Sequence, residues 1–255
     1  MIRVNRGDPP EGFTNRAKAW RARFADYRQQ NPDITASAVW SKVREDIDTD
    51  AKILAERFHY KCAYCEARPR HVSHPHVEHY RPKGLTRFEG KMFDWNNWLL
   101  SCGICNQKKW KHFPEENGQP LLLNPVEEAP SPHLYFIGPR LRGVTNRGKK
   151  TVELVKLDRQ PLHGERESWL SLVHTLLLLW VESEDGKVHQ ECREHLIWTM
   201  QDDAPFAGMT RACLQEKCPK LANPVASHPR LEENNRLERI RELVEQRTLK
   251  LKNLA

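Results

Sequence analysis

Residues 62–65 read Cys-Ala-Tyr-Cys, and residues 102–105 read Cys-Gly-Ile-Cys. Each CxxC segment can form a tight turn whose two thiolates reach one ion, so two segments supply four sulfurs to a tetrahedral Zn²⁺. Four protein ligands leave no open position, so such a zinc is structural. The alternatives are a thioredoxin-like redox pair, which needs one CxxC in a βαβ unit, and coincidence. Two pairs favour zinc, with Cys62, Cys65, Cys102 and Cys105 as its ligands.

Charge and composition narrow the class of protein. The 255 residues are 38% hydrophobic and 29% charged, with a formal net charge of +7, which allows one large or two small globular domains. Residues 55–115 hold eleven Lys and Arg against six Asp and Glu, a local excess of five. A positive surface beside polar ligands suits a polyanion such as nucleic acid, although the same charge is also ordinary for solubility.

Membrane and secreted proteins are disfavoured. The longest uninterrupted apolar run, residues 176–181, is six residues long, whereas a membrane span needs about 18. Residues 1–6 lack the apolar stretch of a secretory signal, and seven cysteines, an odd number, argue against a disulfide framework. We therefore expect a cytoplasmic protein that binds no membrane. The other cysteines, Cys192, Cys213 and Cys218, have poor ligand spacing and are expected to be ordinary thiols.

Hydrophobic periodicity predicts helices on both sides of a small module. The predicted regions are a helical region 1–59, a module 60–115 with the CxxC pairs, a loop-rich basic connector 116–160 and a helical region 161–255. Within them, helices are predicted over residues 14–30, 35–47, 49–58, 161–182 and 231–254. The last of these is amphipathic, and it either packs on its own domain or binds a partner.

The segment between the CxxC pairs carries groups suited to phosphodiester hydrolysis. Residues 76–83 read His-Val-Glu-His-Tyr-Arg-Pro-Lys, and in a strand Glu78 and His79 would face opposite sides. Asn97 precedes the second pair, and Asn106 follows it directly. A histidine with a pKa near neutrality can take a proton from water, and one hard cation held by oxygen ligands can bind the phosphate and the leaving oxygen.

This order of acid-His, Asn and Cys-Asn-x-x-Lys resembles the HNH endonucleases, some of which have the same four-cysteine zinc site. Residues 62–66, 77–83, 98–102 and 113–114 look like the PtuB proteins of Septu and retron anti-phage systems. The resemblance is close over residues 62–114 and loose over residues 115–166. It implies a fold that is mainly α, with a small ββα-metal (HNH) core stapled by the four-cysteine zinc site.

The resemblance also implies roles for individual residues. His79 is the expected general base. Glu78 and Asn106 are the expected ligands of a catalytic Mg²⁺ or Mn²⁺, and Asn97 is expected to hold the loop that orients His79. Glu78 stands where HNH proteins commonly have Asp, and its extra methylene moves the carboxylate outward by about one bond. The basic residues expected to contact flanking phosphates are Arg81, Lys83, Lys108 and Lys109.

The predicted function is that of a metal-dependent HNH endonuclease, with DNA favoured over RNA as substrate. The resemblance to PtuB implies a PtuA-like ATPase partner, which must be another subunit because this chain has no GxxxxGK[ST] motif. The alternative is a non-catalytic zinc module that binds nucleic acid or scaffolds a partner. Trp95, Trp98 and Trp110 are expected to form the core of the module rather than to stack on bases.

Overall fold

The computed structural model describes residues 1–68, 76–222, 238–243 and 245. The chain forms two compact units, one of residues 1–135 with 141–158 and the other of residues 136–140 with 159–255. Among the residues described, helices predominate and the strands form three two-stranded sheets, so the prediction of a mainly helical protein is confirmed. Within the described ranges no helix has the length and apolar character needed to cross a bilayer. Most of the helix predicted over 231–254 lies outside the described residues.

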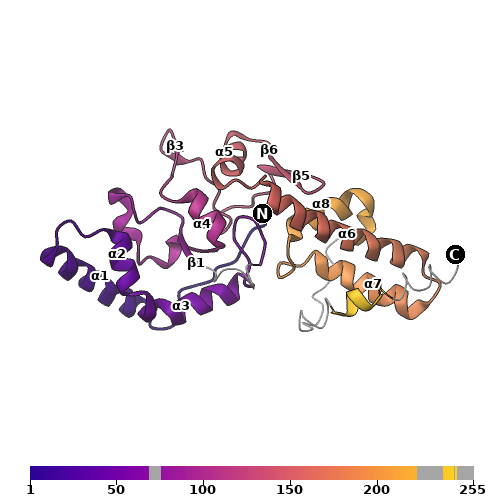
Figure 1. Cartoon of the computed structure of the whole chain (residues 1–255), viewed down its shortest axis with the longest axis horizontal. Helices are drawn as coiled ribbons and strands as arrows, with labels where there is room; N and C mark the ends of the chain where they lie inside the picture. The colour runs from indigo at the N-terminus through magenta and orange to yellow at the C-terminus, as the bar shows by residue number, and fades with distance from the viewer. Residues whose placement is uncertain (69–75, 223–237, 244, 246–255) are drawn as a thin grey trace. The chain divides into compact units, whose positions relative to one another are not determined.

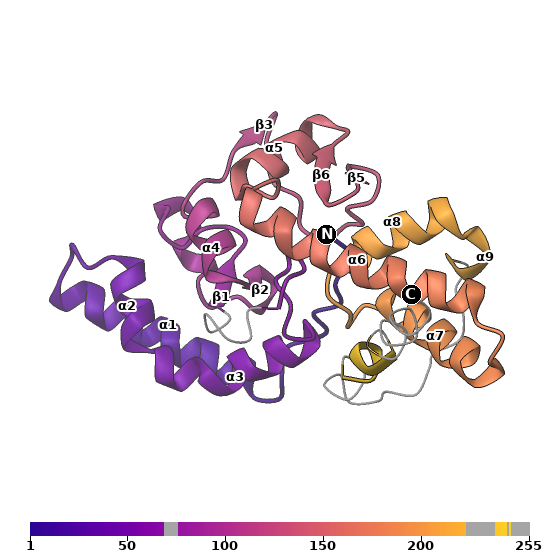
Figure 2. The same ribbon diagram turned by 45° about the vertical axis from the view of Figure 1, so that its right-hand side comes forward.

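Three helices open the first unit: α1 (Phe13–Gln30), α2 (Ala36–Lys42) and α3 (Arg44–Arg57). Figures 1 and 2 both show α2 alongside α1 and α3. The hydroxyl of Thr35 caps α2 by accepting a hydrogen bond from the amide of Ala38 at 3.1 Å. The sequence placed the break between the second and third helices near residue 48, but it lies at the buried Val43. Asp48 is instead inside α3, where it forms an ion pair with Lys52.

The region of the CxxC pairs contains two short strands followed by a helix. The elements are β1 (His76–His79), η1 (Thr86–Lys91), η2 (Trp95–Asn97), β2 (Trp98–Ser101) and α4 (Gly103–Lys109). β1 and β2 are antiparallel, with Glu78 opposite Leu99 and His79 opposite Trp98. All four residues of β2 are buried, as are Glu78 and His79, so this small sheet is covered on both faces.

An aromatic cluster joins the N-terminal helices to this sheet. The ring of Phe13 in α1 meets Trp20, Trp95 and Trp98 edge-on, with centroids 5.2 to 5.9 Å apart. Trp40 of α2 lies flat against Phe93 at 6.0 Å. Such contacts add to the free energy of burying the large rings, so the helices and the sheet share one core.

The chain after α4 contains a helix of which the sequence predicted only the second half, from Thr151 onward. It follows β3 (Glu115–Glu116), β4 (Gln119–Pro120), β5 (Leu134–Ile137) and β6 (Arg140–Gly143), and is α5 (Asn146–Val155). Thr145 caps it by accepting a hydrogen bond from the amide of Gly148 at 3.1 Å. Much of the positive charge predicted for this connector is neutralised by ion pairs: Arg142 with Asp158, Arg147 with Glu128 and Lys150 with Glu153.

The second unit is helical. Its elements are α6 (Gln160–Glu182), α7 (Gly186–Thr199), α8 (Ala207–Lys217) and α9 (Pro219–Ala222). α6 and α7 are joined by residues 183–185 and lie side by side. Their core includes Val173, Leu176, Cys192 and Leu196, all of which are fully buried.

Candidate metal centre and histidine site

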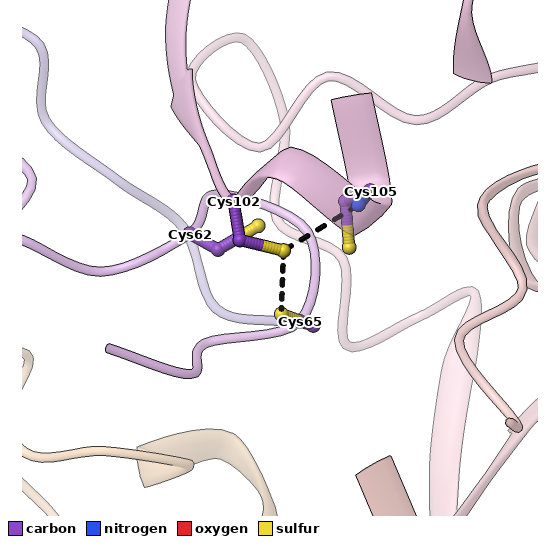
Figure 3. A group of neighbouring side chains, drawn as sticks. All are labelled: Cys62, Cys65, Cys102 and Cys105. Carbon is purple, nitrogen blue, oxygen red and sulfur yellow. Dashed lines mark hydrogen bonds between the residues drawn. The ribbon is translucent and has the colours of Figure 1, made fainter. Parts of the chain in front are cut away.

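Four cysteine thiols converge at the start of α4 (Figure 3). Their sulfurs lie within 4.8 Å of one another, and all four residues are buried. A tetrahedral Zn²⁺ with Zn–S bonds of about 2.3 Å needs sulfurs about 3.8 Å apart. The sulfurs of Cys65 and Cys102 are 3.9 Å apart. The site therefore fits zinc, as predicted, and it is the one such group of His, Cys, Asp or Glu in the part of the chain that the structure describes.

Local backbone geometry explains how each CxxC segment presents two thiols. Cys102 is the N-cap of α4, and its sulfur accepts a hydrogen bond from the amide of Cys105 at 3.4 Å. The first segment is tied to β2 through the amide of Ala63, which donates to the carbonyl of Leu100 at 2.8 Å. Hydrogen bonds from the neighbouring thiols, Cys105 first, lower the pKa of Cys102, which favours the thiolate that binds metal. A zinc bound by the four thiolates would therefore link the first CxxC segment to β2 and α4.

His79, the last residue of β1, lies in the core of the first unit with 3% of its surface exposed. Its Nε2 lies 2.9 Å from the carbonyl oxygen of Met92. That oxygen also accepts a hydrogen bond from the indole nitrogen of Trp98, at 2.8 Å. A carbonyl oxygen can only accept, so Nε2 must carry the proton, and the lone pair of the neutral ring is on Nδ1.

The charge state of His79 is set by burial and by Lys83. Burial lowers the pKa of His79 well below its ordinary value, and the positive charge of Lys83 lowers it further. The ammonium of Lys83 lies 3.5 Å from Nδ1 and 5.4 Å over the ring of Trp40. Nδ1 is thus an unprotonated nitrogen that faces a cation, which is the protonation state a general base requires.

Glu78 lies on the other side of the strand from His79 and is also buried. Its Oε1 forms an ion pair with the ammonium of Lys109 at 2.5 Å, and that ammonium also donates to the carbonyl of His79 at 2.7 Å. Burial raises the pKa of Glu78, while the charges of Lys109 and Lys83 oppose that rise. Lys109, the last residue of α4, is fully buried. It therefore neutralises Glu78 instead of lying on the surface, where the sequence placed it as a phosphate contact.

Asn97 connects the end of β1 to the loop that carries Met92. Its Oδ1 accepts a hydrogen bond from the amide of Arg81 at 2.7 Å. Its Nδ2 donates to the carbonyls of Arg81 and Lys91, at 2.9 and 3.0 Å. Because Met92 follows Lys91 and bonds to His79, Asn97 fixes the loop that orients the imidazole.

The remaining predicted site residues lie nearer the surface. Asn106 is half-buried in α4 and precedes Lys109 by three positions, so it lies on the helix face from which Lys109 reaches Glu78. Lys108 is exposed, and Arg81 is half-buried with its guanidinium over the rings of Tyr80 and Phe113.

Sequence reasoning missed Trp40 and misplaced Trp110. The indole of Trp40 in α2 meets the imidazole of His79 edge-on at 4.5 Å, so a helix from the N-terminal region forms part of the site. No local pattern signals this contact, because residues 40 and 79 meet only after folding. Trp95 and Trp98 are buried as expected, but Trp110 is 62% exposed, so the expectation that all three are core residues is wrong for Trp110.

The fold and site thus define a mainly helical protein with a four-cysteine metal centre next to a buried Glu-His pair. A comparison with models of protein families finds no match. Two curated proteins named Septu protein PtuB are similar to this chain. The one from Bacillus mycoides (strain KBAB4) is 33% identical over 142 aligned residues, covering 45% of this chain and 48% of the relative. The one from Bacillus thuringiensis is 30% identical over 160, covering 62% and 55%. The chain spans about half the length of these relatives.

Proposed function

We propose that this protein is a metal-dependent endonuclease of the HNH type, with His79 as the general base. The state of His79 carries the proposal: its Nε2 proton is fixed by the carbonyl of Met92, and its pKa is low enough to keep Nδ1 unprotonated at neutral pH. A water next to Nδ1 would transfer a proton to it while attacking the phosphorus. A purely structural zinc module needs no such histidine.

Glu78 and Asn106 offer the oxygen ligands that such an enzyme needs for Mg²⁺ or Mn²⁺. Mg²⁺ is commonly held by one or two protein oxygens, with water and substrate phosphate completing its coordination. Oε1 of Glu78 is held by Lys109, which leaves the second oxygen of the carboxylate and the amide oxygen of Asn106 as donors. The bound cation would neutralise the charge that develops on the phosphate and the leaving oxygen.

The ion pair between Glu78 and Lys109 favours a second candidate function, a zinc module that binds nucleic acid without cutting it. In a buried pair at 2.5 Å the ammonium already satisfies the carboxylate. A catalytic cation would have to share Glu78 with Lys109. The two candidates differ in what they require of His79, since binding alone needs no base.

The test is cleavage of plasmid DNA and of RNA by zinc-loaded protein, with and without added Mg²⁺ or Mn²⁺. We expect His79→Ala to lower the rate by about 100-fold or more, which is the range typical of a lost general base. The matched control is His189→Ala in α7, which should cleave like the wild type. Equal cleavage by His79→Ala and wild type would exclude His79 from the mechanism. Binding without cleavage under all conditions would support the second candidate.

The similarity to the Septu PtuB proteins supports a role in anti-phage defence. We propose that the partner subunit is a PtuA-like ATPase. We infer that this ATPase activates or positions the nuclease. Expression of the chain alone and together with a PtuA-like ATPase, followed by phage plating, tests the proposal. We expect protection only from the pair, and loss of protection with His79→Ala. Protection that survives His79→Ala would separate defence from cleavage.

A further inference from the structure

The C-terminal end of α4 presents a tryptophan to solvent. All eight tryptophans lie in the described part of the chain, and Trp110 alone among them is exposed, at 62%. Burying an indole is strongly favourable, so an exposed tryptophan is available to a ligand that stacks on it. Trp110 directly follows Lys109, the residue that pairs with Glu78, so it lies on the same short helix end that contributes to the proposed active site.

The backbone at Trp110 is unfavourable for tryptophan. Its φ is +43° and its ψ is −124°, a conformation that glycine dominates because any Cβ is crowded there. Glycine is also the commonest residue just after a helix. A residue in a disfavoured conformation that buries little of its own side chain contributes little to folding, and such residues cluster at functional sites.

The surroundings of Trp110 are positively charged. The ammonium of Lys111 lies 4.6 Å over the indole ring, and the ring of His112 meets it edge-on at 5.9 Å. Lys108 is exposed on the same end of α4. Residues 95–114 contain no Asp or Glu. A Cβ on Gly84 would lie 3.8 Å from the Cβ of Lys111, so the loop that carries Lys83 runs against this surface.

We propose that Trp110 stacks on an unpaired nucleobase of the substrate, with Lys108 and Lys111 contacting the adjacent phosphates. An exposed aromatic ring among lysines is the arrangement that binds single strands, since every base offers a π-face and every phosphate a negative charge. In a duplex both faces of each base are covered by its neighbours, so the substrate class is single-stranded or locally unpaired nucleic acid. The proposal rests on the nucleic-acid substrate of the proposed function and adds which form of it is bound.

The test is the affinity of the full-length, zinc-loaded chain, carrying His79→Ala to prevent cleavage, for an end-labelled oligodeoxythymidine. A length of about 16 nucleotides matches the upper site size of common single-strand-binding folds. We expect Trp110→Ala to weaken binding by about five- to 150-fold, the range for loss of one stacked base, and Trp110→Phe to retain most of the affinity. A blunt-ended duplex of the same length should show a smaller change.

Two further variants separate binding from folding. Trp110→Gly removes the backbone strain at this position. The variant protein should therefore melt at the same or a higher temperature while losing single-strand affinity. Tyr60 is the matched control, because it is an aromatic residue that is 45% exposed with a φ of +55°. Tyr60→Gly should leave affinity unchanged. A Trp110→Gly protein that melts lower and binds normally would overturn the proposal.

The outcomes also distinguish this proposal from the proposed function. Single-strand binding that depends on Trp110, without cleavage by the wild-type protein either alone or together with the ATPase, would support the stacking site and refute the nuclease. Cleavage with unchanged affinity and KM in Trp110→Ala would support the nuclease and overturn the stacking site. Unchanged nucleic-acid affinity together with loss of ATPase binding by Trp110→Ala would assign the ring to a protein partner instead. Failure of the wild-type chain to bind any single strand would also overturn the proposal.

Discussion

At the scale of single residues, the central feature is the environment of His79. One ring nitrogen is fixed by a backbone carbonyl, and the other faces the ammonium of Lys83 at 3.5 Å. Burial and that charge both lower the pKa of His79. The imidazole is therefore neutral over a wider pH range than an exposed histidine, and it remains able to accept a proton.

Replacing Lys83 tests this environment through the pH dependence of cleavage. Cleavage requires neutral His79, so the rate falls as the pH drops through the pKa of His79. Lys83→Met removes a positive charge that lowers this pKa, so the pKa rises and the acidic limb of the pH–rate profile should move to higher pH. The measurement is the midpoint of that limb, which does not depend on the absolute rate.

Lys108→Met is the matched control for Lys83→Met. Lys108 is an exposed lysine that the sequence also predicts to contact phosphate. Its loss should weaken substrate binding and leave the midpoint in place. If both variants shifted the midpoint equally, the ammonium of Lys83 would not be the group that sets the pKa of His79.

At the scale of secondary structure elements, the site depends on α2 as much as on β1 and α4. The sequence divided the chain into an N-terminal helical region and a separate zinc module. In the structure Trp40 of α2 contacts both His79 and Phe93, and α1 packs on the rings next to β2. The N-terminal helices thus cover the histidine side of β1, and α4 covers the glutamate side.

Trp40→Ala removes a side chain of α2 that contacts His79, so it should lower both the stability of the protein and its cleavage activity. Loss of a half-buried indole is expected to lower the free energy of unfolding by about 2 kcal/mol, less than the 3–5 kcal/mol typical of a fully buried ring. Cleavage should fall by about ten- to 100-fold, because the imidazole loses the ring that holds it in place. Urea denaturation and cleavage assays measure the two effects.

Two further variants show whether Trp40→Ala loses activity through the missing contact with His79 or through lower stability. Trp40→Phe should keep most of the activity, since a ring still packs against His79. Trp180→Ala removes a half-buried tryptophan from α6 in the other unit, so it should lose stability without losing activity once folded. A folded Trp40→Ala protein with full cleavage would show that α2 does not position the base.

At the scale of the whole molecule, the chain consists of two units, and the metal centre belongs to the first. Apparent binding free energies for structural zinc are about 10–16 kcal/mol, as large as the total stability of a typical domain. The second unit has a buried core of its own, which includes Val173, Leu176 and Leu196. The two units should therefore respond differently to loss of metal.

Removal of zinc by a chelator should unfold the first unit selectively. We expect amide hydrogen exchange to rise sharply in β1, β2 and α4 and to change little in α6 and α7. Metal analysis should give one zinc per chain, lost in Cys105→Ser and retained in Cys213→Ser, whose thiol lies outside the cluster. Uniform exchange across both units, or full zinc content in Cys105→Ser, would contradict a structural zinc site.

Part of the fold was predictable because its signals are local. Periodicity predicted α1 and α6 to within about a residue, which is the usual uncertainty of helix ends. The pattern is helical from Thr151 onward, but the first half of α5 was missed because its capping residue, Thr145, lies among glycines and basic residues that indicate a loop. The break between α2 and α3 was misplaced because burial of Val43, a tertiary contact, decides where the chain turns.

The sequence by itself determined the four-cysteine centre, because the CxxC turn brings two sulfurs together over four residues of chain. It also determined the order of Glu78, His79, Asn97 and Asn106 along the chain. Tertiary structure alone decided what surrounds the histidine and the carboxylate. Trp40, Lys109 and the carbonyl of Met92 reach them from separate elements, and no local pattern encodes contacts between such distant residues. The same packing explains why one lysine of α4 is buried against Glu78 while the adjacent tryptophan is left in solvent.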